Sequence, residues 1–304
     1  MNMVFSTGEE LLEICKSENI SISEAAIRYE LMISERDRDE IYEEMRLNLK
    51  TMKDSIKKGL SHKHVSMSGL VGDDSITMLE FASQAAMGER MAKIVASAMA
   101  VTEVNATMGC IVAAPTAGAS GILPGVLIEF AHQHELDDEM ILKGLFNAAA
   151  IGVLIAKNAS ISGASGGCQA ETGSASAMAA SALVEMRGGT PLQSLDAAAM
   201  TLKNVMGLVC DPVAGLVECP CIKRNALGAV NAVLCSDMAL AGIKSIIPFD
   251  EVVTTMKNVG KMMHIDLRET AKGGLAATPT GIKIAENMAK AKQKTSQADN
   301  SKRD

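Results

Sequence analysis

Four cysteines in glycine- and proline-rich segments are the residues of this chain whose type and spacing best suit chemistry. Cys168 ends one such segment, and Cys210, Cys219 and Cys221 lie together further along the chain. Thiolates are ligands both for zinc and for iron–sulfur clusters. Zinc sites usually contain paired Cys-x-x-Cys knuckles, which these residues do not form. The wide spacing therefore favours an iron–sulfur cluster held from two distant loops.

The remaining cysteines stand alone in the sequence, and a lone cysteine usually acts as a small buried apolar residue. We expect this of Cys15, Cys110 and Cys235. Cys168 is expected at a helix N-terminus, where the helix dipole lowers the pKa of a thiol and favours the thiolate that a metal needs.

Two further segments could bind an anion. Thr116-Ala-Gly-Ala-Ser-Gly121 and Ser162-Gly-Ala-Ser-Gly-Gly167 each offer unhindered backbone N–H groups and hydroxyls where a helix begins. Such a loop suits a carboxylate or a phosphate. The alternative for either segment is that its glycines only permit tight turns and close helix crossings.

Hydrolase chemistry and pyridoxal phosphate chemistry are the alternatives to a cluster. Gly163 to Gly167 matches the G-x-S-x-G nucleophile elbow of hydrolases, and His264 follows it as a triad histidine would. That elbow needs a preceding strand, whereas the flanks here are alanine-rich and helical. Pyridoxal phosphate needs a Schiff-base lysine, and neither Lys157 nor Lys223 is singled out by its surroundings.

The composition predicts that helices position these segments. The chain has 304 residues, of which 48% are hydrophobic but only 2% aromatic, with 21 methionines and no tryptophan. A core of Ala, Val, Ile, Leu and Met favours closely packed helices over a β-sandwich with bulky inward-facing residues. We therefore predict an all-α fold, with a single helical catalytic domain whose glycine-rich loops converge on an iron–sulfur cluster.

Apolar residues at steps of three and four predict three helices near the N-terminus. These run from Glu9 to Ser17, from Ser21 to about Ile33, and through a long segment that Ser34 opens, with Asp37 in the capping-box position. Further helical stretches are expected at roughly 75–100, 121–135, 138–157, 173–187, 194–207 and 225–241.

The composition of the sequence changes at two points along the chain. Charge becomes sparse from about Ser61, so we predict an N-terminal helical segment over 1–60 that packs on a catalytic domain over 61–288. Residues 289–304 have no apolar periodicity and are expected to form a disordered tail.

The net charge of −7, without a basic stripe or aromatic stacking platform, argues against nucleic acid as a partner. The N-terminus lacks the pattern of a secretion signal, and Lys143 and Lys157 bracket an apolar stretch too short to span a membrane. These features predict a cytoplasmic protein with no membrane partner, in which cysteines are thiols or metal ligands before they are disulfides.

Four ordered motifs resemble the catalytic alpha chain of iron–sulfur-dependent bacterial L-serine dehydratases. They are AAPTAGASG, SGASGGCQAE, CDPVAGLVECPCIKRN and LRETAKGGLAATPTG, and the resemblance extends over roughly Glu9 to Lys283. It implies a helical catalytic domain and a [4Fe–4S] cluster on three cysteines, which motif by motif are Cys168, Cys210 and Cys221. Cys219 occupies a position that is usually aliphatic in the family, so it is left out of the ligand set.

The resemblance also implies a reaction, the conversion of L-serine to pyruvate and ammonia, with the iron that lacks a protein ligand acting as a Lewis acid on the hydroxyl group. The residues expected around the substrate share polar groups or glycine backbone near the motifs. They are Thr116, Gly118, Ser120, Asn158, Ser160, Ser162, Arg224 and Asn225. Glu171 either caps a helix or meets the substrate ammonium. The general base is left open among a lysine or histidine of this chain and a residue of a partner.

Members of the family with a single chain join a regulatory-type domain to this catalytic part, so we expect a separate beta chain here, and self-association is a further expectation. Within enzymes, the alternative is a related cluster-dependent lyase acting on cysteine or threonine. From another class, the alternative is a non-catalytic iron–sulfur subunit that senses redox state.

Overall fold

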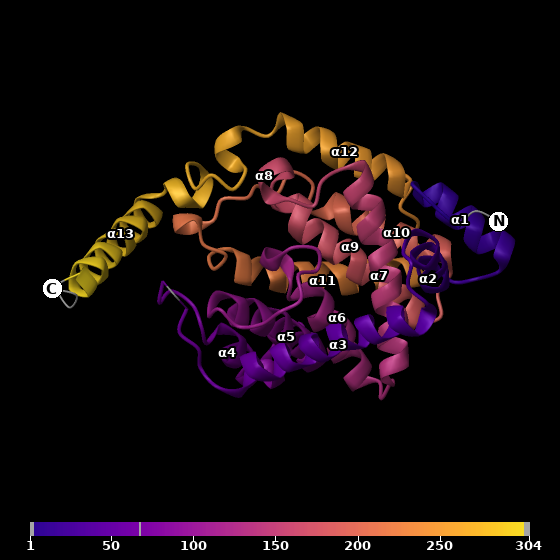
Figure 1. Ribbon diagram of the computed structural model, residues 1–304, viewed down its shortest axis with the longest axis horizontal. Coiled ribbons are helices and arrows are strands. Elements are labelled where there is room, and N and C mark those ends of the chain that lie inside the picture. Colours follow the sequence, from indigo (N-terminus) through magenta and orange to yellow (C-terminus); the bar gives the residue numbers. More distant parts are fainter. Residues whose placement is uncertain (1–2, 67, 301–304) are drawn as a thin grey trace.

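The computed structural model describes residues 3–66 and 68–300. Over this part of the chain the fold is all-α, as predicted, and β-structure is limited to one isolated parallel bridge between Cys210 and Arg268. Figure 1 shows the helices gathered into one body, from which the C-terminal helix projects.

The α-helices follow one another with short connections that contain 3-10 and π-helical turns. They are α1 (Gly8–Glu18), α2 (Ile22–Ile33), α3 (Arg38–Ser61), α4 (Asp74–Glu80), α5 (Glu89–Ala106), α6 (Ile122–Gln133), α7 (Asp138–Asn158), α8 (Gly163–Gly166), α9 (Ser174–Met186), α10 (Pro191–Asn204), α11 (Cys221–Leu240), α12 (Phe249–Met262) and α13 (Pro279–Asn300).

The start of α3 corrects one detail of the expected helix boundaries. The capping box is formed by Asp37, whose side chain accepts from the Glu40 N–H, and not by Ser34 with Asp37. Ser34 instead closes α2, where its N–H donates to the carbonyl of Glu30. Both residues suit a cap, and the two helices that meet here each use one of them.

α9 lies at the centre of the core, packed against α6, α7, α10 and α11. Glu185 is its only residue that is not buried. The helix consists mainly of alanine and serine, and such small side chains let four neighbours approach one axis. The alanine-rich composition thus fills the core through close approach of helices, without bulky rings.

Glycine gives the closest helix contact at the crossing of α5 and α6. A Cβ added at Gly125 would lie 2.6 Å from the backbone nitrogen and 2.7 Å from the Cα of Ala98. Real Cβ atoms do not approach backbone so closely, so this crossing requires glycine.

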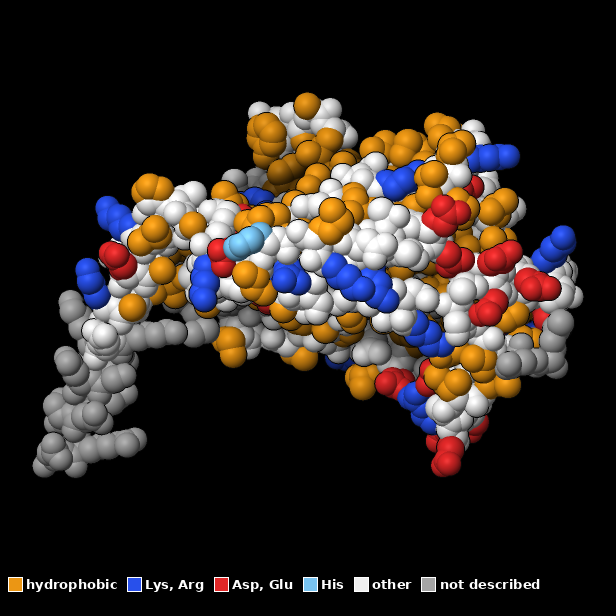
Figure 2. All heavy atoms as spheres, turned by 90° about the horizontal axis from the view of Figure 1, so that it is seen from above, with side chains coloured by type: hydrophobic (Ala, Val, Ile, Leu, Met, Phe, Trp, Pro, Cys, Tyr) orange, Lys and Arg blue, Asp and Glu red, His pale blue; other side chains and the backbone are white. Residues whose placement is uncertain are grey.

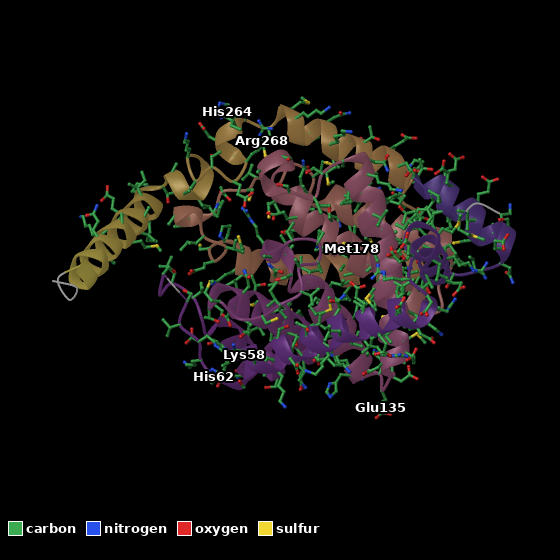
Figure 3. The ribbon with its side chains drawn as sticks, in the orientation of Figure 1. Lys58, His62, Glu135, Met178, His264 and Arg268 are labelled. Carbon is green, nitrogen blue, oxygen red and sulfur yellow. The ribbon has the colours of Figure 1, made fainter. Side chains whose placement is uncertain are left out.

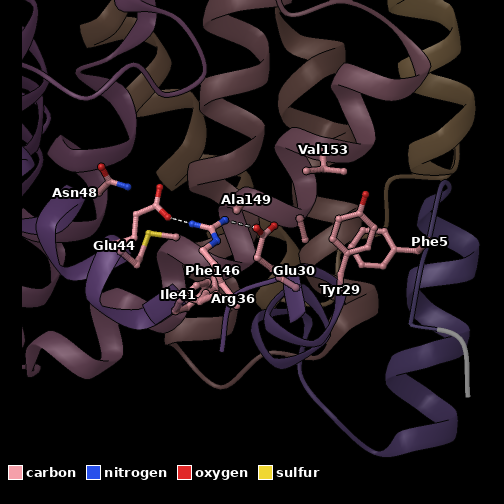
Figure 4. A pocket seen from close by; sticks show the side chains of 13 residues that line it. Phe5, Tyr29, Glu30, Arg36, Ile41, Glu44, Asn48, Phe146, Ala149 and Val153 are labelled. Carbon is pink, nitrogen blue, oxygen red and sulfur yellow. Dashed lines mark hydrogen bonds and ion pairs between the residues drawn. The ribbon is translucent and has the colours of Figure 1, made fainter. Parts of the chain in front are cut away.

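The N-terminal helices pack on the rest of the molecule through α2 against α7 and α3 against α5. A hollow of about 650 Å³ remains between α2, α3 and α7 (Figure 4). Arg36 pairs there with Glu30 and Glu44, and the rings of Phe5 and Tyr29 stand 4.8 Å apart at its edge. The hollow is lined by none of the cysteines. The predicted division at residue 60 stays a prediction.

α7 has the length and mean hydropathy of a membrane-spanning helix, the one described helix that does, but 61% of its apolar window is buried inside the protein. Such burial is typical of a core helix. The cytoplasmic location stays a prediction.

α13 leaves the body after touching it near its start, and its helix continues to Asn300 (Figure 1). Residues 301–304 lie outside the described residues. The disordered tail over 289–304 stays a prediction.

Candidate functional site

The fold brings Cys168 close to Cys210 and Cys221, which lie in a later segment of the chain. The pKa of the Cys210 thiol is raised by burial and by the charges of Glu171, Cys168, Glu269 and Cys221. Burial and the charge of Cys168 raise the pKa of Cys221 to about 12. All three are free thiols. The charge of Cys168 therefore acts on both other thiols, although Cys168 lies far from them in the sequence.

Cys168 is placed by a sharp change of backbone direction. Gly167 before it has φ +77°, a conformation that favours glycine, and the π-helical turn Gln169–Gly173 follows it. Its sulfur lies 3.0 Å from the Thr172 hydroxyl. The expected lowering of the Cys168 pKa is wrong, because burial raises it more than the favourable contacts lower it.

Cys210 is held by the only β-bridge among the described residues. Its N–H donates to the Leu267 carbonyl at 2.9 Å, and its carbonyl accepts from the Glu269 N–H at 2.7 Å. Cys221 opens α11 directly after Pro220. Cys210 and Leu267 are the first residues of two of the four motifs and lie more than fifty residues apart, so the two motifs meet in backbone hydrogen bonds at Cys210.

Arg224 joins the cysteine loops through a buried ion pair. Its guanidinium lies 2.9 Å from Asp211, with side chains only 14% and 4% exposed, and it also donates to the Val209 carbonyl. It faces Cys168 as well, and the two groups shift each other's pKa. Asp211 in turn accepts from the Leu275 N–H at 2.7 Å. Arg224 and Asp211 therefore connect the segments of Val209 and Leu275 beside Cys168.

Glu171 lies among the three cysteines. Its charge raises the pKa of Cys168, Cys210 and Cys221 alike. One carboxylate oxygen accepts from the Thr116 hydroxyl at 2.8 Å, and the other lies 3.7 Å from the Cys210 sulfur. Burial raises the pKa of Glu171 itself. The carboxylate is not a helix cap but part of the cysteine site.

The loop before α6 reaches the same place. A Cβ added at Gly118 would lie 3.4 Å from a Glu171 oxygen, in ordinary contact range. The Asn225 amide fixes this loop, because it donates to the Gly118 carbonyl at 2.8 Å and accepts from the Gly121 N–H at 3.0 Å. Thr116, Gly118, Arg224 and Asn225 therefore share the neighbourhood of the cysteines.

The other four expected residues make different contacts. The Ser120 hydroxyl is buried and donates to the Ala117 carbonyl, and Asn158 donates to the carbonyls of Ser6 and Leu154. The Ser160 hydroxyl accepts from the Ser162 N–H. The Ser120, Asn158 and Ser160 side chains therefore bond backbone groups, and the roles of these four residues toward a substrate stay predictions.

Ser160 also lines a hollow with Lys257 and Lys261 of α12. The hollow lies beside α12. Figure 2 views the molecule from this side and shows a row of basic side chains on the surface. The role of Ser160 toward a substrate stays a prediction.

Besides Asp211, a further buried carboxylate lies near the cysteines, and the sequence motifs do not indicate its role. Glu218 is 3% exposed and accepts hydrogen bonds from the hydroxyls of Ser66, at 2.7 Å, and Ser68. The only local indication of this contact in the sequence is the pair of serines, Ser66 and Ser68, before Gly69. This contact ties the loop after α3 to the Cys210–Cys221 segment.

The remaining cysteines divide as follows. Cys15 and Cys235 are buried, as expected, whereas Cys110 is exposed, which corrects the expectation for that residue. Cys219 is half-buried beside Cys221.

The hydrolase interpretation fails on geometry. Gly163–Gly166 is the short helix α8, and no strand precedes it in the described chain. His264 is exposed and lies 3.4 Å from Asp266, outward on the segment that also carries Arg268 (Figure 3).

The described His, Cys, Asp and Glu side chains include no group of three placed to hold a single metal ion. A multi-iron cluster differs in this respect, because each cysteine binds a separate iron at its own corner. The three thiols need not converge on one point to hold such a group.

Comparison with known proteins gives one consistent result. The profile of the family described as serine dehydratase alpha chain matches residues 17–276. A probable L-serine dehydratase alpha chain of Bacillus subtilis is 48% identical over 94% of this chain and 95% of its own length. The L-serine dehydratase alpha chain of Peptoniphilus asaccharolyticus is 44% identical over 94% of this chain and 99% of its own.

Longer relatives match over part of their length. L-serine dehydratase 1 of Escherichia coli is 38% identical over 90% of this chain but only 61% of its own. Because the family profile and these relatives match most of its length, including the motifs around the three cysteines, this chain belongs to the serine dehydratase alpha chain family.

Proposed function

We propose that this chain is the alpha subunit of an L-serine dehydratase, a lyase that converts L-serine to pyruvate and ammonia. The observation that carries the proposal is the match to two alpha chains over 95% and 99% of their lengths. The names of these relatives specify L-serine. They give no support to a lyase for cysteine or threonine, or to a redox-sensing subunit.

Cys168, Cys210 and Cys221 would hold a [4Fe–4S] cluster in this subunit. Three features support them as ligands. They are free thiols, the charge of Cys168 is close enough to raise the pKa of both Cys210 and Cys221, and Arg224 offsets negative charge beside Cys168. Metal binding deprotonates a thiol despite a raised pKa, at the expense of some affinity. When bound, the cluster supplies Lewis acidity at an iron that has no protein ligand.

The protein's own part is to bind and orient L-serine beside this group. The reaction removes a proton from Cα and the hydroxyl from Cβ, and the resulting water and 2-aminoacrylate leave. The imine tautomer of 2-aminoacrylate then takes up one water to give pyruvate and ammonia. Ala117 and Gly118, at the start of the turn that Asn225 fixes, present N–H groups suited to the substrate carboxylate.

We also propose a separate beta chain as partner. Two relatives are named alpha chains, and this chain spans only about 60% of the single-chain relatives. The remaining part of those longer proteins would correspond to the partner. Self-association is compatible with this assembly and stays a prediction.

Oxygen-free purification with the partner chain tests the proposal. We expect brown protein with about four irons per alpha chain and pyruvate release from L-serine. Cys168→Ala, Cys210→Ala and Cys221→Ala should each lose both properties, whereas Cys235→Ala should keep them. A colourless, fully active and metal-free preparation would overturn the cluster, and wild-type iron content in Cys210→Ala would overturn the ligand set.

A further inference from the structure

We propose that Glu171 recognises the α-ammonium group of the substrate and so makes the site selective for α-amino acids. This inference rests on the proposed function and names one group of the substrate-binding site. The Glu171 carboxylate lies between the loops of Thr116, Gly163 and Cys210.

The first observation is how closely backbone approaches this carboxylate. A Cβ added at Gly163 would lie 2.6 Å from one oxygen of Glu171 and 2.8 Å from the Cys210 sulfur. Glycine there leaves room for both the carboxylate and the thiol. The carboxylate thus occupies a fixed position beside a proposed cluster ligand.

The second observation is that the carboxylate has few donors and no cation. Its described partners are the Thr116 hydroxyl and the Cys210 thiol, and no described Lys, Arg or His side chain forms an ion pair with it. A carboxylate has about four acceptor positions. Once Cys210 is a thiolate ligand it no longer donates, so only Thr116 remains.

Glu103, a buried glutamate elsewhere in this protein, differs from Glu171 in its hydrogen-bond donors. Its carboxylate accepts from the Asp74 N–H at 2.8 Å, from the Ser75 N–H and from the Ser75 hydroxyl, at the start of α4. Two backbone N–H groups and one hydroxyl therefore satisfy that carboxylate. Glu171 lacks such donors, although a partly buried carboxylate without a partner is costly.

An ammonium group supplies what Glu171 lacks. It brings one positive charge and three N–H donors, and the surrounding thiolates add negative potential at the same place. L-serine carries this group two bonds from its hydroxyl carbon. A 3-hydroxy acid without the amine, 3-hydroxypropionate, has the hydroxyl and the carboxylate but nothing for Glu171.

The test compares these two molecules on the iron-loaded enzyme with its partner chain. In Glu171→Gln we expect KM for L-serine to rise about 10- to 100-fold, the effect of losing a hydrogen bond between charged groups. The inhibition constant of 3-hydroxypropionate should change less than about threefold, since that ligand makes no such bond. Iron content and visible absorption should match the wild type.

Two further variants complete the design. Glu103→Gln, the matched buried glutamate, should lower thermal stability and leave KM unchanged. Glu171→Asp keeps the charge and should keep the preference for L-serine, which decides the question even if Glu171→Gln loses iron. Loss of the preference in Glu171→Asp overturns the inference.

Two results for Glu171→Gln also overturn it: an unchanged KM, or equal weakening of both ligands, which would show a purely structural role. If the wild-type enzyme forms pyruvate normally in these experiments, only the ammonium site is wrong. A wild-type enzyme without serine deamination overturns the proposed function together with this inference.

Discussion

Glycine makes close contacts both in the helical core and at the cysteine site, but it meets different partners in the two regions. At the crossing of α5 and α6, Gly125 faces the backbone of Ala98. At the site, Gly163 faces the ends of two functional side chains, Glu171 and Cys210. In the core, small residues let helices approach each other, and at the site they let loops approach reactive groups.

The two regions also differ in the polar groups that they bury, which are uncharged in the core and charged at the site. Around α9 the polar groups are uncharged hydroxyls: Ser176 donates to the Thr172 carbonyl and Ser181 to the Asn147 side chain. At the site, charged groups are buried or partly buried: Arg224 pairs with Asp211, and Glu171 lies beside Cys210. A change in the core should therefore affect stability alone, whereas a change at the site should also affect iron and substrate.

The largest effect is expected from Arg224→Ala, which leaves Asp211 buried without its cation. Breaking such a pair costs about 3–5 kcal/mol of unfolding free energy, and iron retention should fall as the Cys168 and Leu275 segments loosen. Chemical denaturation and iron analysis measure the two effects.

Arg187→Ala is the matched control, because its pair with Asp237 is 32% and 58% exposed. Exposed pairs contribute at most about 1 kcal/mol. Equal stability of the two variants would break the comparison between a charged site and an apolar core.

An intermediate effect is expected from adding one methyl group in each region. Gly125→Ala should lower the free energy of unfolding by about 1–3 kcal/mol, because backbone cannot move aside, and leave iron content unchanged. Gly163→Ala should cost less stability, since side-chain ends can move, but should displace Glu171 and Cys210. Iron per chain and KM for L-serine then distinguish the variants, and the reverse pattern would refute the distinction.

The smallest effect is expected from Thr190→Ala at the start of α10, which packs on α9. The variant loses a capping box in which Thr190 and Gln193 satisfy each other's backbone N–H groups. Such a cap contributes about 1 kcal/mol to stability, and iron content and KM should not change. Thr190→Ser keeps the hydroxyl and should remain near the wild type in the same denaturation measurement. Altered substrate affinity in Thr190→Ala would show that the regions are coupled.

Sequence patterns predicted most of the helices, because their signals are local. The stretch expected at roughly 75–100 is divided into α4, a 3-10 turn and α5, and α12 was not expected. The apolar stripe of α3 and the small residues of α9 depend only on spacing and side-chain size. The boundary near Ser34 was misplaced, since two adjacent residues both suit a cap and only packing decides between them.

The candidate site was predicted through its motifs, but its contacts were not. Nothing local shows that Cys210 pairs with Arg268, or that Glu218 accepts from Ser66, because these contacts join distant segments. The pKa of Cys168 was misjudged for the same reason: burial is a property of the whole fold. Glu171 could be named from its motif, but its place among three cysteines required the structure.

The scarcity of aromatic residues has a consequence for spectroscopy. The chain has no tryptophan, and its two tyrosines, Tyr29 and Tyr42, lie in α2 and α3. Intrinsic fluorescence of this chain therefore reports only on the N-terminal helices, while the visible absorption of a bound cluster would report only on the cysteine loops. The molecule would thus carry two optical signals that arise from different regions, and melting curves followed by each would reveal whether residues 1–60 unfold together with the rest.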